Sequence, residues 1–262
     1  MAFDLEKFAA TSEPVGWDDL DFGTFDTQPL DAETLRCLRY MCDVEYHTSC
    51  YLRDMLVTPS HEEETAGGFM TVWNREEFWH GEALAAVLQR HGIVVDYDEL
   101  KSRRAKLGWK EALSPLKQSV LSGLAGTDFV AVHMTWGAAN ELSAVSAYRR
   151  LSAMTEHPAL SPLLKRIAQQ ETRHVAFYTT QGRARLEASQ KARWLTHFAM
   201  SKAWRPVGSG IMPEAEIQHV MGHLFAGQGT ELDALDQKIQ KLPGLGELTV
   251  FRDAFARMGI HR

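Results

Sequence analysis

The sequence is poor in cysteine and has no excess of basic residues. Its three cysteines, Cys37, Cys42 and Cys50, lie in one segment and form no Cys-x-x-Cys pair. No disulfide framework is therefore expected, and a reducing, cytoplasmic location fits this composition. The formal net charge is −6. This charge argues against a nucleic-acid partner, because proteins that bind phosphate backbones usually concentrate basic residues on one surface.

Long hydrophobic runs and strand-like alternation are also missing. The most apolar stretch, residues 129–139, is too short to cross a bilayer and is followed by Asn140 and Glu141, so no membrane span is expected. The N-terminus has no basic region followed by an apolar run, so no signal peptide is expected. No alternating pattern competes with helical periodicity, and the fold is predicted to be all-α.

Apolar residues recur at helical spacing in four long segments, which predict helices over 31–57, 60–91, 127–156 and from 161 towards 204. Their predicted starts are Asp31 as an N-cap, a capping box of Ser60 with Glu63, Thr127 as a cap, and Ser161 followed by Pro162. The fourth helix is predicted to bend at Gly182. Residues 93–126 are predicted to be a long connection, and further helices are expected after Pro213 and over 248–258.

The length of 262 residues suits one large domain or two small ones. The pattern predicts three parts: an irregular N-terminal arm over 1–30, a helical bundle over 31–205, and a C-terminal helical extension over 206–262 that packs on the bundle. The arm is assigned because its Asp, Thr, Gly and Pro residues show no sustained period.

Two of the predicted helices carry a Glu followed three residues later by a His: Glu77 with His80, and Glu171 with His174. Residues three apart share one helix face, so each pair can present an oxygen and a nitrogen to one metal ion. A further Glu precedes each motif, Glu45 by 32 residues and Glu141 by 30. Mid-helix positions meet at one level in an antiparallel bundle. The predicted di-metal site therefore has six ligands: Glu45, Glu77, His80, Glu141, Glu171 and His174.

A third Glu-x-x-His, Glu216 to His219, shows that the motif alone is weak evidence for a site. Glu216 follows Pro213 in a first helical turn, where an acidic residue favours the helix dipole, so this copy is assigned to the surface. Glu141 is the strongest single candidate. It follows the apolar stretch 129–139, where an unpaired buried carboxylate would be strongly unfavourable.

At these motifs the chain resembles the soluble acyl-[acyl-carrier-protein] desaturases of the ferritin-like di-iron carboxylate superfamily. The similar segments are Glu76-Glu77-Phe-Trp-His80-Gly81-Glu82 and Gln170-Glu171-Thr-Arg173-His174, and the resemblance covers roughly residues 31 to 180. It implies a ferritin-like four-helix bundle with a long crossover between helices 2 and 3 and additional C-terminal helices. The six predicted ligands become iron ligands by this resemblance. Gln170 stands where plant desaturases have an Asp associated with the electron route.

The implied activity is that of an O2-activating non-haem di-iron oxidoreductase, desaturase-like or oxygenase-like, acting on an acyl or other hydrophobic substrate. An external electron donor such as ferredoxin and a homodimer are implied as well. Two iron ions are expected, although Mn/Fe and Mn/Mn sites use overlapping ligands. Two alternatives stay open: a ferritin-like metal-binding or iron-oxidising protein without an organic substrate, and a metal-free helical interaction protein. The sequence assigns no role to Glu76, Glu82 or Tyr178.

Overall fold

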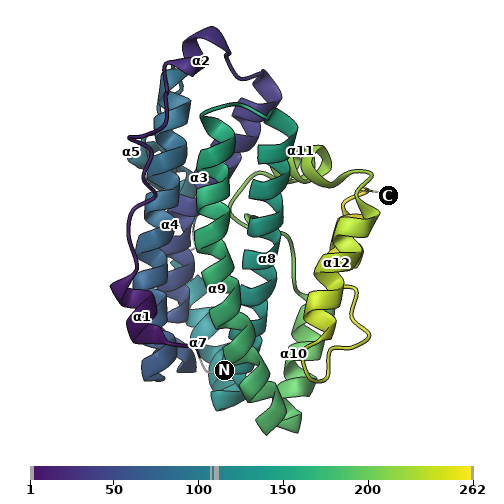
Figure 1. Ribbon diagram of the computed structural model, residues 1–262. Coiled ribbons are helices and arrows are strands. Elements are labelled where there is room, and N and C mark those ends of the chain that lie inside the picture. The colour runs from purple at the N-terminus through teal and green to yellow at the C-terminus, as the bar shows by residue number, and fades with distance from the viewer. Residues whose placement is uncertain (1–2, 107, 109–111, 261–262) are drawn as a thin grey trace.

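Four long helices form the body of the protein. The computed structural model describes residues 3–106, 108 and 112–260. The long helices lie side by side and pack as two pairs, α3 with α4 and α8 with α9 (Figure 1). Their bounds are α3 Ala32–Met55, α4 Glu64–Arg90, α8 Phe129–Thr155 and α9 Leu160–Ala188. The described residues contain helices and connecting segments but no strand, which confirms the all-α prediction.

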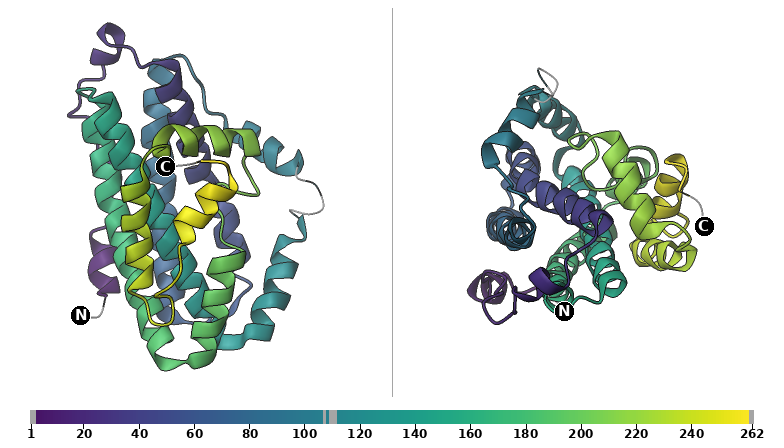
Figure 2. Two further views of the ribbon diagram at one scale, coloured as in Figure 1. Left: turned by 90° about the vertical axis from the view of Figure 1, so that its right-hand side faces the viewer. Right: turned by 90° about the horizontal axis from the view of Figure 1, so that it is seen from above.

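Shorter helices surround this body. The connection from α4 to α8 carries two of them, and α10 to α12 lie along the outer side of α8 (Figures 1 and 2). No helix of the described residues is long and apolar enough to cross a bilayer. The short helices are α1 Leu5–Ala10, α2 Thr24–Thr27, α5 Tyr97–Lys106, α7 Ser114–Ala125, α10 Gln190–Lys202, α11 Glu214–Phe225, α12 Gly229–Gln240 and α13 Val250–Arg257, with the 3-10 turns η1 Pro59–His61 and η2 Gly126–Asp128.

The N-terminal segment is more ordered than predicted, because it contains α1 and α2. The reason is aromatic burial. Phe8 on α1 stacks on Phe69 of α4 with ring centroids 5.2 Å apart, and Phe25 on α2 stacks on the His157 ring at 4.4 Å. A few large apolar side chains thus order a segment that has no helical period of its own.

Two of the predicted helix ends are confirmed and one start is wrong. The Asp31 carboxylate accepts a hydrogen bond from the Thr34 backbone N–H at 2.7 Å and caps α3. Gly92 follows the end of α4 with φ of 74°. The Ser60 capping box does not form, since Ser60 lies in η1 and α4 begins at Glu64. The Ser60 hydroxyl instead pairs with His133 Nδ1 at 2.7 Å.

The predicted caps of the other two long helices are also wrong. Thr127 lies in η2, and α8 begins two residues later. At the start of α9 the cap is a histidine, because His157 Nδ1 accepts the backbone N–H groups of Ala159 and Leu160 at 3.1 and 3.2 Å. The Ser161 hydroxyl donates to the Ser152 carbonyl oxygen across to α8. His157, three residues before the first residue of α9, therefore has the role that was predicted for Ser161.

The fourth predicted helix is two helices, and it does not break at Gly182. The α9 helix runs past that residue to Ala188, and Ser189 then caps α10 by accepting the Ala192 N–H. A Cβ at Gly182 would lie 3.4 Å from Thr135 Oγ1 on α8. An added methyl group would thus be in ordinary van der Waals contact, and Gly182 lies on the side of α9 that faces α8.

The C-terminal region carries one helix that the pattern did not predict. The helix after Pro213 is confirmed as α11, and the last predicted helix is confirmed as α13. Between them lies α12, whose buried Leu232, Leu235 and Ile239 do have helical spacing. The buried Asp236 carboxylate accepts the N–H groups of Phe251 and Arg252, so α12 holds the start of α13.

His133 makes a testable contribution to acid stability. This side chain is 2% exposed, and burial lowers its pKa to about 3. Below pH 6.5 the unfolded chain binds a proton that the folded chain does not, so stability is lost as the pH falls from 6.5 towards 3. Between pH 7 and pH 5 this loss is about 2 kcal/mol. The His133→Gln variant is expected to lose that much less free energy of unfolding in urea titrations. The exposed His197→Gln is the control, and an unchanged pH dependence in His133→Gln would contradict the assignment.

Candidate metal centre

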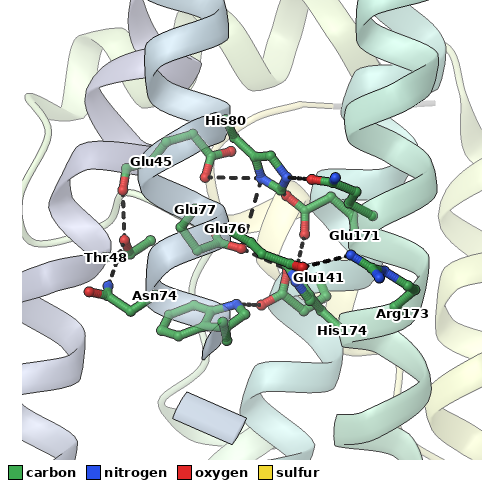
Figure 3. Close-up of polar contacts among 12 residues, drawn as sticks. Glu45, Thr48, Asn74, Glu76, Glu77, His80, Glu141, Glu171, Arg173 and His174 are labelled. Atoms are coloured by element: carbon green, nitrogen blue, oxygen red, sulfur yellow. Dashed lines mark hydrogen bonds and ion pairs between the residues drawn. The ribbon is translucent and has the colours of Figure 1, made fainter. Parts of the chain in front are cut away.

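All six predicted ligands meet in the middle of the four long helices (Figure 3). The first pair, α3 and α4, supplies three of them, and the second pair, α8 and α9, supplies the other three. None of the six side chains is more than 5% exposed. A buried set of four carboxylates and two imidazoles needs cations or protons to balance its charge.

The ligand atoms form two overlapping groups, and all atoms within each group lie within 4.8 Å of one another. Glu77 and Glu171 belong to both groups, so each can place one oxygen towards either position. The first group is Glu45, Glu77, His80 and Glu171, and the second is Glu77, Glu141, Glu171 and His174. Each group could hold a metal ion, and Glu77 and Glu171 are available to both groups.

Both histidines direct Nδ1 into the cluster. His80 Nδ1 lies 3.2 Å from Glu171 Oε1, and 4.0 Å from both Glu45 Oε2 and Glu77 Oε1. His174 Nδ1 lies 2.8 Å from Glu171 Oε2 and 3.1 Å from Glu77 Oε1. The two imidazole centroids are 6.0 Å apart. Each nitrogen is thus placed among carboxylate oxygens of its own group.

The outer nitrogens of the two histidines have hydrogen-bond partners that fix this orientation. His174 Nε2 lies 2.7 Å from Glu76 Oε2, and His80 Nε2 lies 2.9 Å from Gln170 Oε1. Arg173 donates to the other oxygen of Glu76 at 2.6 Å. Donation of Nε2–H to these oxygens leaves Nδ1 as the ligand nitrogen. Glu76, which had no predicted role, therefore positions His174.

Two further side chains, which the sequence analysis missed, hold the outer carboxylates. Trp73 Nε1–H donates to Glu141 Oε1 at 3.1 Å, and the Tyr148 hydroxyl donates to Glu45 Oε1. The spacing contains a signal for both. Trp73 stands four residues before Glu77, and Tyr148 seven residues after Glu141, so each shares a helix face with a ligand.

Several buried ligand atoms have no hydrogen-bond partner among the described residues. They are Glu45 Oε2, Glu77 Oε1, His80 Nδ1 and Glu171 Oε1. Buried polar atoms are nearly always paired, so unpaired oxygens and a nitrogen that face one another indicate a missing cationic partner. The donor set of carboxylate oxygens and imidazole nitrogens fits iron or manganese. The residues present therefore fit a metal ion in each group.

The pKa values of the buried ligands indicate that protons neutralise the cluster when no metal ion is bound. Burial, and repulsion from Glu171, raise the pKa of Glu77 and of Glu141 well above its usual value. For His174, burial opposes the proton, but the hydrogen bonds to Glu171 and Glu76 and the neighbouring Glu77 carboxylate outweigh it and raise the pKa well above its usual value. Protons therefore balance the carboxylates when no metal is bound, and metal binding must release them.

A cavity of about 430 Å³ lies beside both ligand groups. Four of the ligands, Glu45, Glu77, Glu141 and Glu171, form its floor. Its walls come from α3, from α8 and from residues 203–212, which connect α10 to α11. The cavity thus leads from the buried carboxylates to the connection on the surface.

Two hydrogen bonds hold this connection over the cavity. Trp204 Nε1–H donates to Asn140 Oδ1 at 3.1 Å, and the Tyr40 hydroxyl donates to the Val207 carbonyl oxygen at 2.6 Å. Gly208 has φ of 91°, and a Cβ there would lie 2.3 Å from the Tyr40 hydroxyl. A glycine is therefore required for the connection to lie this close to α3.

The aromatic residues near the two motifs, and the two remaining residues without a predicted role, differ in burial and in their distance from the cavity. Trp136 lines the cavity, whereas Phe78 is exposed and Phe177 stacks on Phe69 in the core. Tyr178 is buried and also lines the cavity, and Glu82 is exposed.

The surface assignment of the third Glu-x-x-His is confirmed. Glu216 accepts two hydrogen bonds from Arg36 at 2.8 Å each, and His219 pairs with Glu33 at 2.5 Å. Both side chains are thus engaged in surface ion pairs, far from any cluster of carboxylates in the part of the chain that is described.

Comparison with models of known protein families gives no match, and comparison with curated proteins gives none either.

Proposed function

We propose that the protein is an O2-activating non-haem di-iron oxidoreductase with a ferritin-like bundle, desaturase-like or oxygenase-like, that acts on an acyl or other hydrophobic substrate. The observation that carries the proposal is the pair of four-ligand groups that share Glu77 and Glu171 and open on one cavity. The proposed electron donor is an external protein such as ferredoxin.

Charge balance supports two divalent ions. The six ligands include four carboxylates, Glu45, Glu77, Glu141 and Glu171, which two divalent cations would neutralise. The buried carboxylate of Glu76, next to this cluster, is already paired with Arg173 and His174. Iron is the proposed metal, since this ligand set is the one that ferritin-like di-iron proteins use.

Bound iron would supply the electron-transfer chemistry with O2, and the chain supplies orientation, proton placement and a dry site. Glu76 and Gln170 hold the outer N–H groups of the two histidines. Trp73 donates a hydrogen bond to one oxygen of Glu141, and Tyr148 donates one to an oxygen of Glu45. The other oxygen of each carboxylate would then be available to a metal ion. These contacts fix all four outer ligands before a substrate enters.

The cavity favours an apolar substrate. Apart from the ligands, its walls include Trp136, Ala144, Tyr178, Pro206 and Ile211. Ligand pockets combine such apolar walls with a few polar groups at the reacting end. Here the polar end is the carboxylate floor, so a hydrocarbon segment bound in the cavity would lie next to the metal positions.

The experiment loads the protein with ferrous iron without air, adds O2 and records the visible spectrum, with and without an acyl substrate and a reductant. A new visible band and an oxidised or desaturated product are expected. The Ala144→Phe variant fills the cavity wall and is expected to lower product formation at least about tenfold while metal content stays unchanged.

The matched control is Ala234→Phe on the exposed side of α12, which should keep full product formation. Oxidation of bound iron with no organic product from any acyl substrate would favour the ferritin-like iron-oxidising alternative. Equal product formation by Ala144→Phe and the parent protein would show that the substrate does not use this cavity.

A further inference from the structure

The α7 helix has its apolar side turned outward. Leu116, Val120, Leu121 and Leu124 are exposed, and Leu124 reaches 78%. The buried residue of this helix is Ser122. An ordinary surface helix buries its apolar face and exposes its polar one. The reversed arrangement therefore indicates that something apolar covers the outer face of α7.

The α10 helix carries an exposed aromatic pair between two lysines. Trp194 is 65% exposed and stacks on the exposed Phe198, with ring centroids 6.0 Å apart. Lys191 and Lys202 are exposed too, at spacings of three and four residues from the pair, so all four side chains lie on one helix face. Aromatic residues flanked by lysines on one face are typical of helices that lie in a membrane interface.

Charge is distributed unevenly between this region and the rest of the chain. The protein has a formal net charge of −6. Residues 188–213 nevertheless contain no Asp or Glu, while they contain Lys191, Arg193, Lys202 and Arg205. Residues 112–125 also lack acidic residues and contain Lys117. Both segments that carry the exposed apolar faces are thus basic, and among the described residues only Lys191 of this set is paired across to an acid, Asp128 of η2 at 3.6 Å. This charge complements an anionic surface.

The two helices lie at the same end of the molecule (Figures 1 and 2). The turn η2 lies between them, because it follows α7 directly in the chain and packs against α10. Lys191 Nζ donates to the Ala125 carbonyl oxygen at 3.0 Å, joining the start of α10 to the end of α7. Immediately after α10, the exposed Ala203 and Arg205 line the cavity. The C-terminal end of α10 therefore adjoins the cavity.

We propose that the exposed faces of α7 and α10 dock on a membrane that contains anionic lipid. The aromatic pair and the α7 leucines enter the interface, and the lysines contact lipid headgroups. Docking places the cavity opening against the bilayer, from which a lipid-borne acyl chain can enter. This last consequence rests on the proposed function, whereas membrane binding itself does not.

Two other occupants fit the observations less well. A second copy of the chain, related by a twofold axis through α10, would bring the same basic residues together, and like charges across an interface are unfavourable. An acidic carrier protein would match the charge but would leave the outward leucines of α7 without apolar contact. A membrane surface satisfies both the charge and the apolar area.

The test is co-sedimentation of the metal-loaded full chain with phosphatidylcholine vesicles that contain roughly one third phosphatidylglycerol. Binding is expected to weaken as salt is added and to be much weaker on phosphatidylcholine alone. The double variant Trp194→Ala/Phe198→Ala should bind at least about tenfold more weakly. Lys117→Gln/Lys202→Gln should lose about fivefold for each lysine. Both variants change exposed side chains, and circular dichroism checks that they fold.

The controls are Val94→Ala and Lys238→Gln, which alter exposed residues elsewhere and should leave binding unchanged. No sedimentation of the parent protein with anionic vesicles would overturn the proposal. So would a dimer in solution that the aromatic double variant converts to a monomer, because a second copy would then cover the face. Metal content and O2 reactivity are measured on the same samples, so failure of vesicle binding with intact iron chemistry overturns this inference alone.

Discussion

Replacing Glu171 by alanine is expected to remove both metal ions together. This carboxylate belongs to both ligand groups, and it lies 3.2 Å from His80 Nδ1 and 2.8 Å from His174 Nδ1. Without it each group keeps three ligands and loses one of its two shared carboxylates. Metal analysis of protein produced with iron and manganese should therefore fall from about two ions per chain to well below one.

Variants of the other ligands make this expectation specific. Glu141→Ala removes a ligand of one group only and should retain about one ion per chain. Glu216→Ala breaks the surface copy of the motif and should retain both ions. A Glu171→Ala protein that binds as much metal as the parent protein would disprove the two-site interpretation, and equal losses for Glu141→Ala and Glu171→Ala would disprove the bridging role.

Gly137→Ala is expected to be among the most destabilising single changes in the bundle. A Cβ at this position on α8 would lie 2.4 Å from Cε1 of Tyr178 on α9. The Tyr178 ring borders the cavity, but its contacts with Phe69 and Trp73 oppose a shift of the ring away from Gly137. Overpacking of this kind should lower the free energy of unfolding by about 2 to 3 kcal/mol in urea titrations.

The matched control is Gly123→Ala on α7, where nothing lies within 4 Å of the added Cβ. There the better helix propensity of alanine should raise the free energy of unfolding by up to about 1 kcal/mol. The same chemical change thus has opposite expected signs at two helical glycines. A stability of Gly137→Ala equal to that of the parent protein would mean that the Tyr178 ring moves aside.

The presence of most helices could be predicted from the sequence, because a helix that buries one face repeats its apolar residues every three to four positions. The four long helices and α11 and α13 were found this way. The starts at Ser60, Thr127 and Ser161 were wrong, because the choice of a cap depends on contacts from elsewhere in the fold. Ser60 is paired with His133. His157 accepts the first N–H groups of α9, while Phe25 and Gln28 of the N-terminal segment contact its ring. Local pattern carries no information on such contacts.

The candidate site was predictable for a related reason. Its six ligands were chosen by the Glu-x-x-His spacing and by their position along each predicted helix. Both can be read from one helix at a time. The positioning residues were harder to find. Glu76 resembled any exposed glutamate beside the motif, and only the approach of α9 shows that it lies between Arg173 and His174. The cavity could not be predicted, since residues 203–212 close it through contacts with Tyr40 and Asn140 on two other helices.

The exchange of ligands between the helix pairs has a consequence for the amount of folded protein in a cell. The ligand group that lies mainly on α3 and α4 also contains Glu171 of α9, and the group that lies mainly on α8 and α9 also contains Glu77 of α4. Neither half of the chain therefore holds a complete group alone. Metal ions would therefore fasten the two halves to each other, and the unfolded chain would offer them no comparable position. Under metal limitation the equilibrium shifts towards the open chain. With iron as the proposed metal, cellular iron supply would then set how much protein survives proteolysis.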